Sequence, residues 1–118
     1  MVVNQGVVAV IFVSQRSKHD AEGYAAAAAE MGAAAERFPG YVGIHSVRGD
    51  DGVGITVSFW ESEAAARAWK NDATHAAIRD KGRARWYEWY DLIVAEVTRS
   101  YSWSREAAPS AAAPAESR

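Results

Sequence analysis

The stretch SFWESEAAARAWKNDATHAAIR, residues 58–79, organises the rest of the chain. It reads as the end of a β-strand, followed by a capped helix and a second helical segment. Ser62 stands between the strand and an alanine-rich run, which is the usual place of a helix N-cap. Glu61 and Glu63 suit the positive end of that helix. Because tryptophan, histidine and arginine are concentrated here, the stretch is also the first place to look for a site.

The segments after Ser62 are expected to complete the fold. One helix is predicted over residues 64–70, and a second helical segment over 72–81 continues or restarts it. Gly82 is expected to cap the end of this segment, because glycine readily adopts the left-handed conformation found there. Residues 83–90 read as an aromatic connection, and residues 91–103 as the last strand.

A β-hairpin precedes the stretch. Residues 41–48 and 53–60 are rich in branched and aromatic side chains, and Gly49-Asp50-Asp51-Gly52 between them is typical of a tight turn. In the second strand, side chains alternate between two faces of the sheet. One face carries Val53, Ile55, Val57 and Phe59, and the other carries Gly54, Thr56, Ser58 and Trp60. The second face is small and polar until Trp60, which leaves room for something beside that ring.

The N-terminal part predicts a strand and a long helix. The segment from Gly6 to Arg16 is apolar at odd and even positions alike, as in a strand covered on both faces. A helix is expected over residues 21–37, with Asp20 as its N-cap and Pro39 beyond its end. Its apolar stripe is predicted to comprise Tyr24, Ala27, Ala28, Met31, Ala35 and Phe38.

The element order β-α-β-β-α-β predicts an α+β, ferredoxin-like fold, a four-stranded antiparallel sheet with the helices on one face. The other face is open and apolar, so a homodimer that buries this face against a second copy is expected. The folded domain is predicted to span residues 1–103. Residues 104–118 are rich in Ala, Pro, Ser and Glu and are predicted to be a disordered tail.

Composition excludes several classes of function. A formal net charge of −2 over 118 residues argues against nucleic acid as a partner, since phosphate binding needs a basic surface. The absence of cysteine excludes disulfides and thiolate chemistry and suits a cytoplasmic protein. The start of the chain lacks the features of a signal peptide, and the apolar run over residues 7–13 is too short to cross a membrane.

His75 is the histidine with the most suggestive neighbours. The three histidines, His19, His45 and His75, lack the helical spacing of a metal site, so no metal is expected. On a helix, Asp72 and Arg79 lie on the same side as His75. Asp72 could orient the imidazole and Arg79 could hold an anionic oxygen. The simpler interpretation, favoured by spacing alone, is a surface string of charges that stabilises a short helix.

Aromatic residues supply the candidate binding surface. Trp60 and Trp69 could both line the space between the helix and the sheet, although filling of the core is the more common role of such a pair. Ser58 lies on the same strand face as Trp60. Trp86 and Tyr87 pose the same alternative, because a buried indole or phenol needs a hydrogen-bond partner and a ligand is one possibility.

The sequence resembles the antibiotic biosynthesis monooxygenase superfamily, and most closely its poorly characterised YqjZ-type bacterial branch. The resemblance spans about residues 7–103. It rests on motifs that occur in the family's order: Ser14-Gln15-Arg16, Phe38-Pro39-Gly40-Tyr41, the segment 54–62, Trp69, His75, Gly82-Arg83, Trp86-Tyr87 and Tyr90.

The resemblance implies a dimeric α/β barrel in which two such sheets pair. It also implies oxidation of a small aromatic or polyketide-like substrate by dioxygen without metal or flavin. In that reaction His75 would accept a proton, Arg79 would stabilise the oxyanion, and Trp60 and Trp69 would stack on the rings. A non-catalytic dimeric module that binds a small molecule remains the alternative function.

Haem-degrading relatives imply a further alternative that the residues disfavour. Those proteins use an asparagine on the first strand, a tryptophan in the second helix and an axial histidine ten residues beyond it. Trp69 matches the tryptophan, but the tenth residue after it is Arg79, and His75 comes one helical turn early. Residues 7–16 contain no asparagine. The sequence therefore favours a site without haem.

Overall fold

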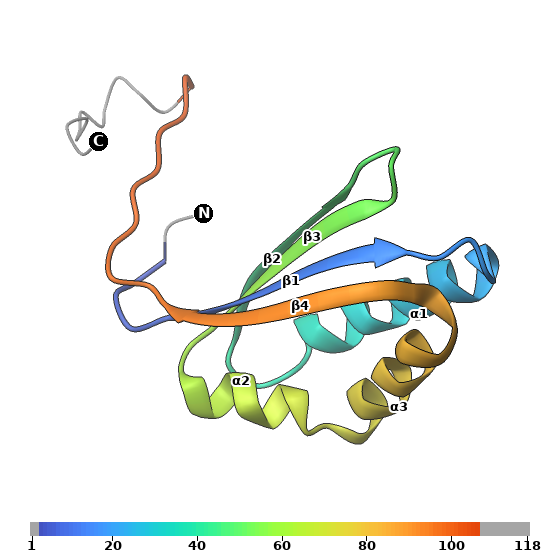
Figure 1. Ribbon diagram of the computed structural model, residues 1–118. Coiled ribbons are helices and arrows are strands. Elements are labelled where there is room, and N and C mark those ends of the chain that lie inside the picture. Colours follow the sequence, from blue (N-terminus) through green and yellow to red (C-terminus); the bar gives the residue numbers. More distant parts are fainter. Residues whose placement is uncertain (1–2, 107–118) are drawn as a thin grey trace.

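The computed structural model describes residues 3–106. Its elements follow the chain as β1 (Val8–Arg16), α1 (Ala21–Glu36), β2 (Tyr41–Arg48), β3 (Val53–Trp60), α2 (Glu63–Lys70), α3 (Ala73–Lys81), the π-helical turn η1 (Gly82–Trp86) and β4 (Tyr87–Glu96). The strands form one antiparallel sheet in the order β2-β3-β1-β4. The helices cover one face and leave the other open (Figure 1). The predicted α+β, ferredoxin-like fold is confirmed.

Strand β1 runs through the centre of the sheet, and its two ends carry different groups. At its start Val8 pairs with Trp60 of β3, and at its end Arg16 pairs with Tyr87 of β4. Eight residue steps at about 3.3 Å separate these ends by about 26 Å. The two pairs therefore mark opposite ends of the domain.

Helix α1 begins as the sequence predicts. The Asp20 side chain accepts a hydrogen bond from the Gly23 amide and is the N-cap, with a left-handed φ of 55°. The helix buries Ala27 and Ala35 against the sheet. Ala28, however, is exposed, so the predicted apolar stripe is wrong at that position. The helical face that meets the sheet is narrower than the run of alanines suggests.

The last strand begins four residues earlier and ends seven residues earlier than predicted. It begins at Tyr87 and ends at Glu96, because β1 offers pairing partners only from Arg16 back to Val8. Gly82 is not a C-cap, since α3 passes directly into η1. A Cβ at residue 82 would lie 2.8 Å from a ring carbon of Tyr87, so the glycine permits the close approach of that ring.

The open face of the sheet exposes large apolar side chains. Val47, Ile55 and Ile93 point to this face by register and are 72%, 44% and 49% exposed. The residues of the predicted tail from 107 onward lie outside the described part of the chain. Within the described part, no helix has the length and apolar character needed to cross a membrane.

Candidate functional site

One end of the domain is filled by what we call the tryptophan cluster, comprising Trp60, Trp69, Phe38 and Tyr41. Trp60 is fully buried and stacks on Trp69 with ring centroids 5.6 Å apart. Phe38 packs its edge against both indoles, and Tyr41 packs against Trp60. The Trp60 indole N–H donates to the Ser58 hydroxyl at 3.0 Å. The space between α2 and β3 is therefore occupied by rings.

His75 lies against the outer side of this cluster. Its ring centroid is 4.7 Å from that of Trp69, and its Nδ1 lies 3.0 Å from the Trp69 carbonyl oxygen. A carbonyl can only accept, so Nδ1 carries the proton of that hydrogen bond. Burial lowers the pKa of His75 below its ordinary value of 6.5. At neutral pH the imidazole is therefore uncharged, and its lone pair is on Nε2.

Arg79 completes the group on the same helix. Its Nη1 donates to the Lys70 carbonyl at 3.3 Å. Its Nε is buried and, within the described part of the chain, has no hydrogen-bond partner. The nearby positive charge also helps to lower the pKa of His75, after burial. Such an unpartnered buried donor is uncommon in proteins and marks a place where a ligand acceptor fits.

The break between α2 and α3 brings these groups together. Asp72 accepts from the His75 amide at 3.3 Å, as an N-cap does, while the Trp69 carbonyl holds the imidazole ring. His75 and Arg79 thus both donate to carbonyls at the C-terminal end of α2. Because the chain turns at Asn71 and Asp72, a histidine six residues after a tryptophan lies on its ring.

An uncovered apolar strip borders the cluster on the helix side of the sheet. Leu92 and Val94 share this side by register with Phe12 and Val10, and they remain 48% and 53% exposed. Val10 itself packs against the tryptophan cluster. A hollow of about 350 Å³ extends the strip towards the start of α2, where Ser62 and Glu63 face Val94. The strip therefore joins the tryptophan cluster through Val10, the strand neighbour of Val94.

Trp86 and Tyr87 lie at the opposite end of β1. They belong to what we call the tyrosine–arginine network, comprising Arg16, Arg48, Tyr24, Trp86 and Tyr87. The Tyr24 ring packs edge-on against the rings of both Trp86 and Tyr87. The structure therefore groups Ser58, Trp60, Trp69, His75 and Arg79 at one end and separates the other two candidate residues from them.

Arginines hold this network closed. Arg48 donates to the Gly52 carbonyl at 2.6 Å, to the carbonyl and hydroxyl of Ser14, and to the Tyr24 hydroxyl at 3.1 Å. Arg16 donates to the Trp86 carbonyl at 2.6 Å and stacks over the Tyr24 ring. These donors are satisfied within the fold, which is the pattern of a structural network.

The remaining polar groups of the network are also paired. The Trp86 indole N–H donates to Asp20 at 3.2 Å, and this hydrogen bond lowers the pKa of Asp20. Burial raises the pKa of the Tyr87 phenol above its ordinary value. Both side chains thus have clear roles in holding β4 and η1 against α1.

Sequence reasoning missed the arginines of this network. A Cβ at residue 54 would lie 2.6 Å from the Arg48 guanidinium carbon, so Arg48 occupies the room beside the small face of β3. The signal was Gly54 itself, because a glycine inside a strand often marks the close approach of another group. Among the described residues, no three histidine or carboxylate side chains are grouped as a metal site would require.

Comparison with known proteins decides the family. The sequence model of the antibiotic biosynthesis monooxygenase family matches residues 7–81. The chain belongs to this family. It is also similar to the uncharacterised protein YqjZ of Bacillus subtilis (strain 168). The two sequences are 46% identical over 91 residues, which cover 77% of this chain and 79% of YqjZ.

Solved structures share the fold of this monooxygenase-family chain at low sequence identity. Rv0793 of Mycobacterium tuberculosis has a TM-score of 0.72 and 14% identity, covering 81% of the chain and 99% of Rv0793. A mutant of SnoaB, a cofactor-independent oxygenase of Streptomyces nogalater, has a TM-score of 0.70 and 14% identity, covering 80% of the chain and 96% of SnoaB. These likenesses support the fold.

Proposed function

We propose that this chain is a cofactor-independent monooxygenase that oxidises a small aromatic or polyketide-like substrate with dioxygen. Family membership supports the reaction class, and SnoaB is a cofactor-independent oxygenase of the same fold. The observation that carries the proposal is the pairing of His75, with its unshared Nε2 lone pair, and Arg79, with its unpartnered Nε. Together they supply a base and an oxyanion donor.

In this proposal His75 Nε2 removes a proton from a phenol or enol of the substrate. The lowered pKa keeps His75 neutral at pH 7 and therefore able to accept this proton. Arg79 stabilises the resulting oxyanion through its charge and its free N–H. The enolate or phenolate is electron-rich enough to react with dioxygen directly.

The reaction balances without an external reductant. A substrate CH₂ group becomes a carbonyl, which gives up four electrons to one molecule of dioxygen. One oxygen atom enters the substrate as the new C=O, and the other leaves as water with the two hydrogens. The substrate is therefore its own reductant, and the protein contributes positioning, proton transfer and charge stabilisation.

The substrate rings are proposed to lie on the apolar strip, which adjoins the tryptophan cluster through Val10. Leu92 and Val94 supply exposed apolar surface. Trp60 and Ser58 support Trp69 from within the core, because Trp60 is fully buried and bonded to Ser58. Trp86 and Tyr87, at the far end of β1, are proposed to act on the scaffold through the tyrosine–arginine network.

The test is a screen of anthrones, quinols and polyphenols with an oxygen electrode. A substrate is expected to consume one dioxygen for each product formed, and His75→Ala is expected to lower kcat by about 10²–10⁴-fold. His19→Ala is the matched control, because His19 is exposed in the loop before α1. Full turnover by His75→Ala on a proven substrate removes the base assignment.

We also propose that the protein is a homodimer through the open face of its sheet. Exposed Val47, Ile55 and Ile93 form an apolar surface that a second copy would bury. Sedimentation equilibrium is expected to give twice the chain mass, and Ile55→Lys is expected to shift the protein towards the monomer. A monomer at every concentration would refute the dimer.

A non-catalytic module that binds a small molecule is the second candidate. It is favoured by the bonds from His75 and Arg79 to the last carbonyls of α2, since these contacts alone would account for both side chains. A ligand that raises the melting temperature, shows no oxygen uptake and still binds His75→Ala would favour this function.

A further inference from the structure

The apolar strip continues past Leu92 to an aromatic end. Tyr90 pairs with Ser14 and therefore lies on the helix side of the sheet, as Leu92 does opposite Phe12. The Phe12 and Tyr90 rings pack together with their centroids 5.1 Å apart. Four residue steps at about 3.3 Å place Tyr90 about 13 Å from Val94, which lies near the tryptophan cluster. The strip is thus long enough for a small aromatic molecule to lie along it.

Arg83 lies over this far end of the strip. It belongs to η1, the π-helical turn that links α3 to β4. Its Nε donates to the Tyr90 hydroxyl at 2.6 Å, and its guanidinium carbon lies 5.8 Å from the centre of the Tyr90 ring. A π-helical turn is a rare feature and is often found at functional sites. The turn here brings a cation onto the phenol at the end of an apolar surface.

The Arg83–Tyr90 pair offers hydrogen-bond donors to a ligand. The Tyr90 hydroxyl accepts the bond from Arg83, and its own proton can be donated in a second bond. A guanidinium carries five N–H donors and a permanent charge, and the bond to Tyr90 uses one donor. Arg83 is exposed, so a ligand can reach its other donors. A charged group of this kind favours an acceptor oxygen, and a carboxylate most of all.

The two ends of the strip differ in charge. At the end near the tryptophan cluster, Glu63 and Glu96 line the hollow of about 350 Å³ at the start of α2. Glu63 forms an ion pair with Arg67, and Glu96 adds a carboxylate on the helix side of β4 by register. At the other end stand Arg83 and Tyr90. An anionic group on the strip is therefore repelled from the first end and attracted to the second.

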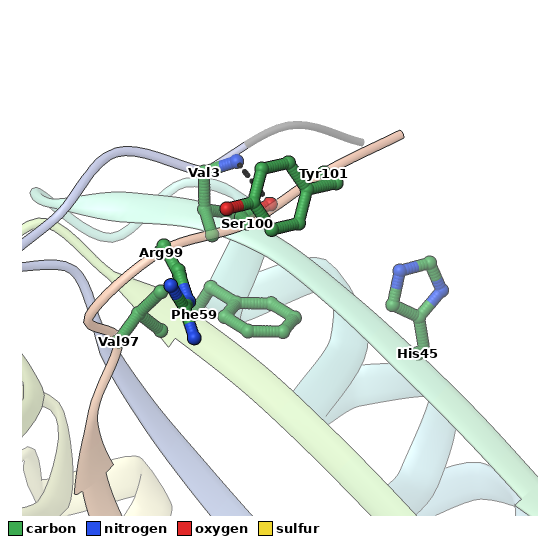
Figure 2. A pocket seen from close by; sticks show the side chains of 7 residues that line it. All are labelled: Val3, His45, Phe59, Val97, Arg99, Ser100 and Tyr101. Atoms are coloured by element: carbon green, nitrogen blue, oxygen red, sulfur yellow. Dashed lines mark hydrogen bonds between the residues drawn. The ribbon is translucent and has the colours of Figure 1, made fainter. Parts of the chain in front are cut away.

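The open face of the sheet offers a different place for an anion. Asp91, which follows Tyr90, pairs with Val13 and so lies on the open face, away from the strip. On that face Phe59 and Arg99 line a separate hollow of about 360 Å³ (Figure 2). The sheet lies between this hollow and the strip. Variants can therefore distinguish the two places.

We propose that Arg83 and Tyr90 form a second polar subsite, which binds a carboxylate at the far end of an aromatic substrate. The rings lie along the apolar strip, between this subsite and the His75–Arg79 pair. The inference rests on the function proposed above and names the chemical class of its substrate, an aromatic acid whose reacting phenol or enol and carboxylate are at opposite ends. The subsite touches the substrate but no reacting atom, so it sets orientation and specificity.

The first test compares two probes, p-coumarate and its neutral amide, by calorimetric titration of the full chain. The wild type is expected to bind the carboxylate about tenfold more tightly than the amide, because only the carboxylate makes a charge-assisted hydrogen bond. Arg83→Met should abolish this preference and change the affinity for the amide by less than about twofold. Tyr90→Phe keeps the ring on Phe12 and should weaken carboxylate binding by about threefold, the loss of one neutral donor.

The control variants remove arginines at other places. Arg85→Met makes the same change of charge at an exposed position of the same turn, and it should keep the preference. Arg99→Met tests the hollow on the open face and should also keep it. A wild type that binds neither probe, or both equally, overturns the subsite. So does a preference that survives in Arg83→Met, including one that is lost in Arg79→Met or Arg99→Met.

A second measurement separates this inference from the proposed reaction. The Nε–H resonance of Arg83 is expected to shift when p-coumarate is added and to stay in place with the amide. No shift overturns the subsite. His75→Ala lacks the proposed base and should keep the preference for the carboxylate. Full turnover by His75→Ala on a proven substrate would refute the base alone, because the binding of the two probes requires no turnover.

Discussion

The tryptophan cluster and the tyrosine–arginine network lie at opposite ends of β1 and look alike in composition. Both bury aromatic rings between the helices and the sheet, and both have arginine within or beside them. They differ in what their polar groups do. Arg48 and Arg16 donate to acceptors within the fold, whereas Arg79 Nε has no partner among the described residues, and the bond from His75 Nδ1 leaves the lone pair of that ring on Nε2.

This difference shows where chemistry is available. A polar network whose donors and acceptors are all paired makes a fold rigid, and it has few free hydrogen-bonding groups that could bind a ligand. The tryptophan cluster instead is bordered by a neutral imidazole, by an arginine whose Nε has no partner among the described residues, and by an apolar strip. Density of aromatic residues alone would not have separated the two ends.

The largest expected effect comes from removing Trp60. Trp60→Ala should lower the free energy of unfolding by about 3–5 kcal/mol, because it opens a cavity among Trp69, Phe38 and Tyr41. Urea denaturation followed by far-UV circular dichroism would measure the change. A cost below about 1 kcal/mol would show that the cluster is not a packed core and would weaken the comparison.

The closed network can be tested through Gly54. Gly54→Ala would place a methyl group against the Arg48 guanidinium and should cost about 1–3 kcal/mol of stability. Gly32→Ala is a matched control in α1, because nothing lies within 4 Å of its added Cβ. That change should stabilise the helix by up to about 1 kcal/mol. Equal effects at both sites would contradict the structural role assigned to Arg48.

His75 should make stability depend on pH. Its pKa is lowered in the folded state, so the unfolded chain binds the proton more readily. The free energy of unfolding should therefore fall as the pH drops below 6.5, the ordinary pKa of histidine. It should continue to fall until the pH reaches the lower pKa that His75 has in the folded protein. The variant His75→Asn can still donate a hydrogen bond to the Trp69 carbonyl but does not titrate. Its stability should therefore lack this contribution to the pH dependence. Thermal unfolding between about pH 7.5 and 5 measures both proteins.

The smallest expected effect on stability is that of Arg79. Arg79→Met removes one hydrogen bond to Lys70 but also an unpartnered buried donor, so the net change should be below about 1 kcal/mol. Binding of a phenolate ligand should nevertheless weaken by about tenfold, the loss of one charge-assisted hydrogen bond. Calorimetric titration of wild type and variant separates the two effects. If the affinity for phenolate is unchanged, the role of Arg79 is limited to its hydrogen bond with the Lys70 carbonyl at the end of α2.

Local signals in the sequence predicted most of the fold. Asp20 and Ser62 cap their helices, and the hairpin over β2 and β3 has the predicted strands. These features depend on neighbouring residues and on backbone preferences. The errors at Ala28, Gly82 and the bounds of β4 depend instead on contacts between distant segments, such as the Tyr87 ring against Gly82.

The candidate site follows the same division. The residues of the stretch 58–79 were sufficient to single out Trp60, Trp69, His75 and Arg79. Only the tertiary structure decided that Trp86 and Tyr87 lie about 26 Å away along β1. It also decided that His75 bonds to the Trp69 carbonyl. Periodicity describes one regular element, whereas strand register and the break between two helices determine which side chains meet.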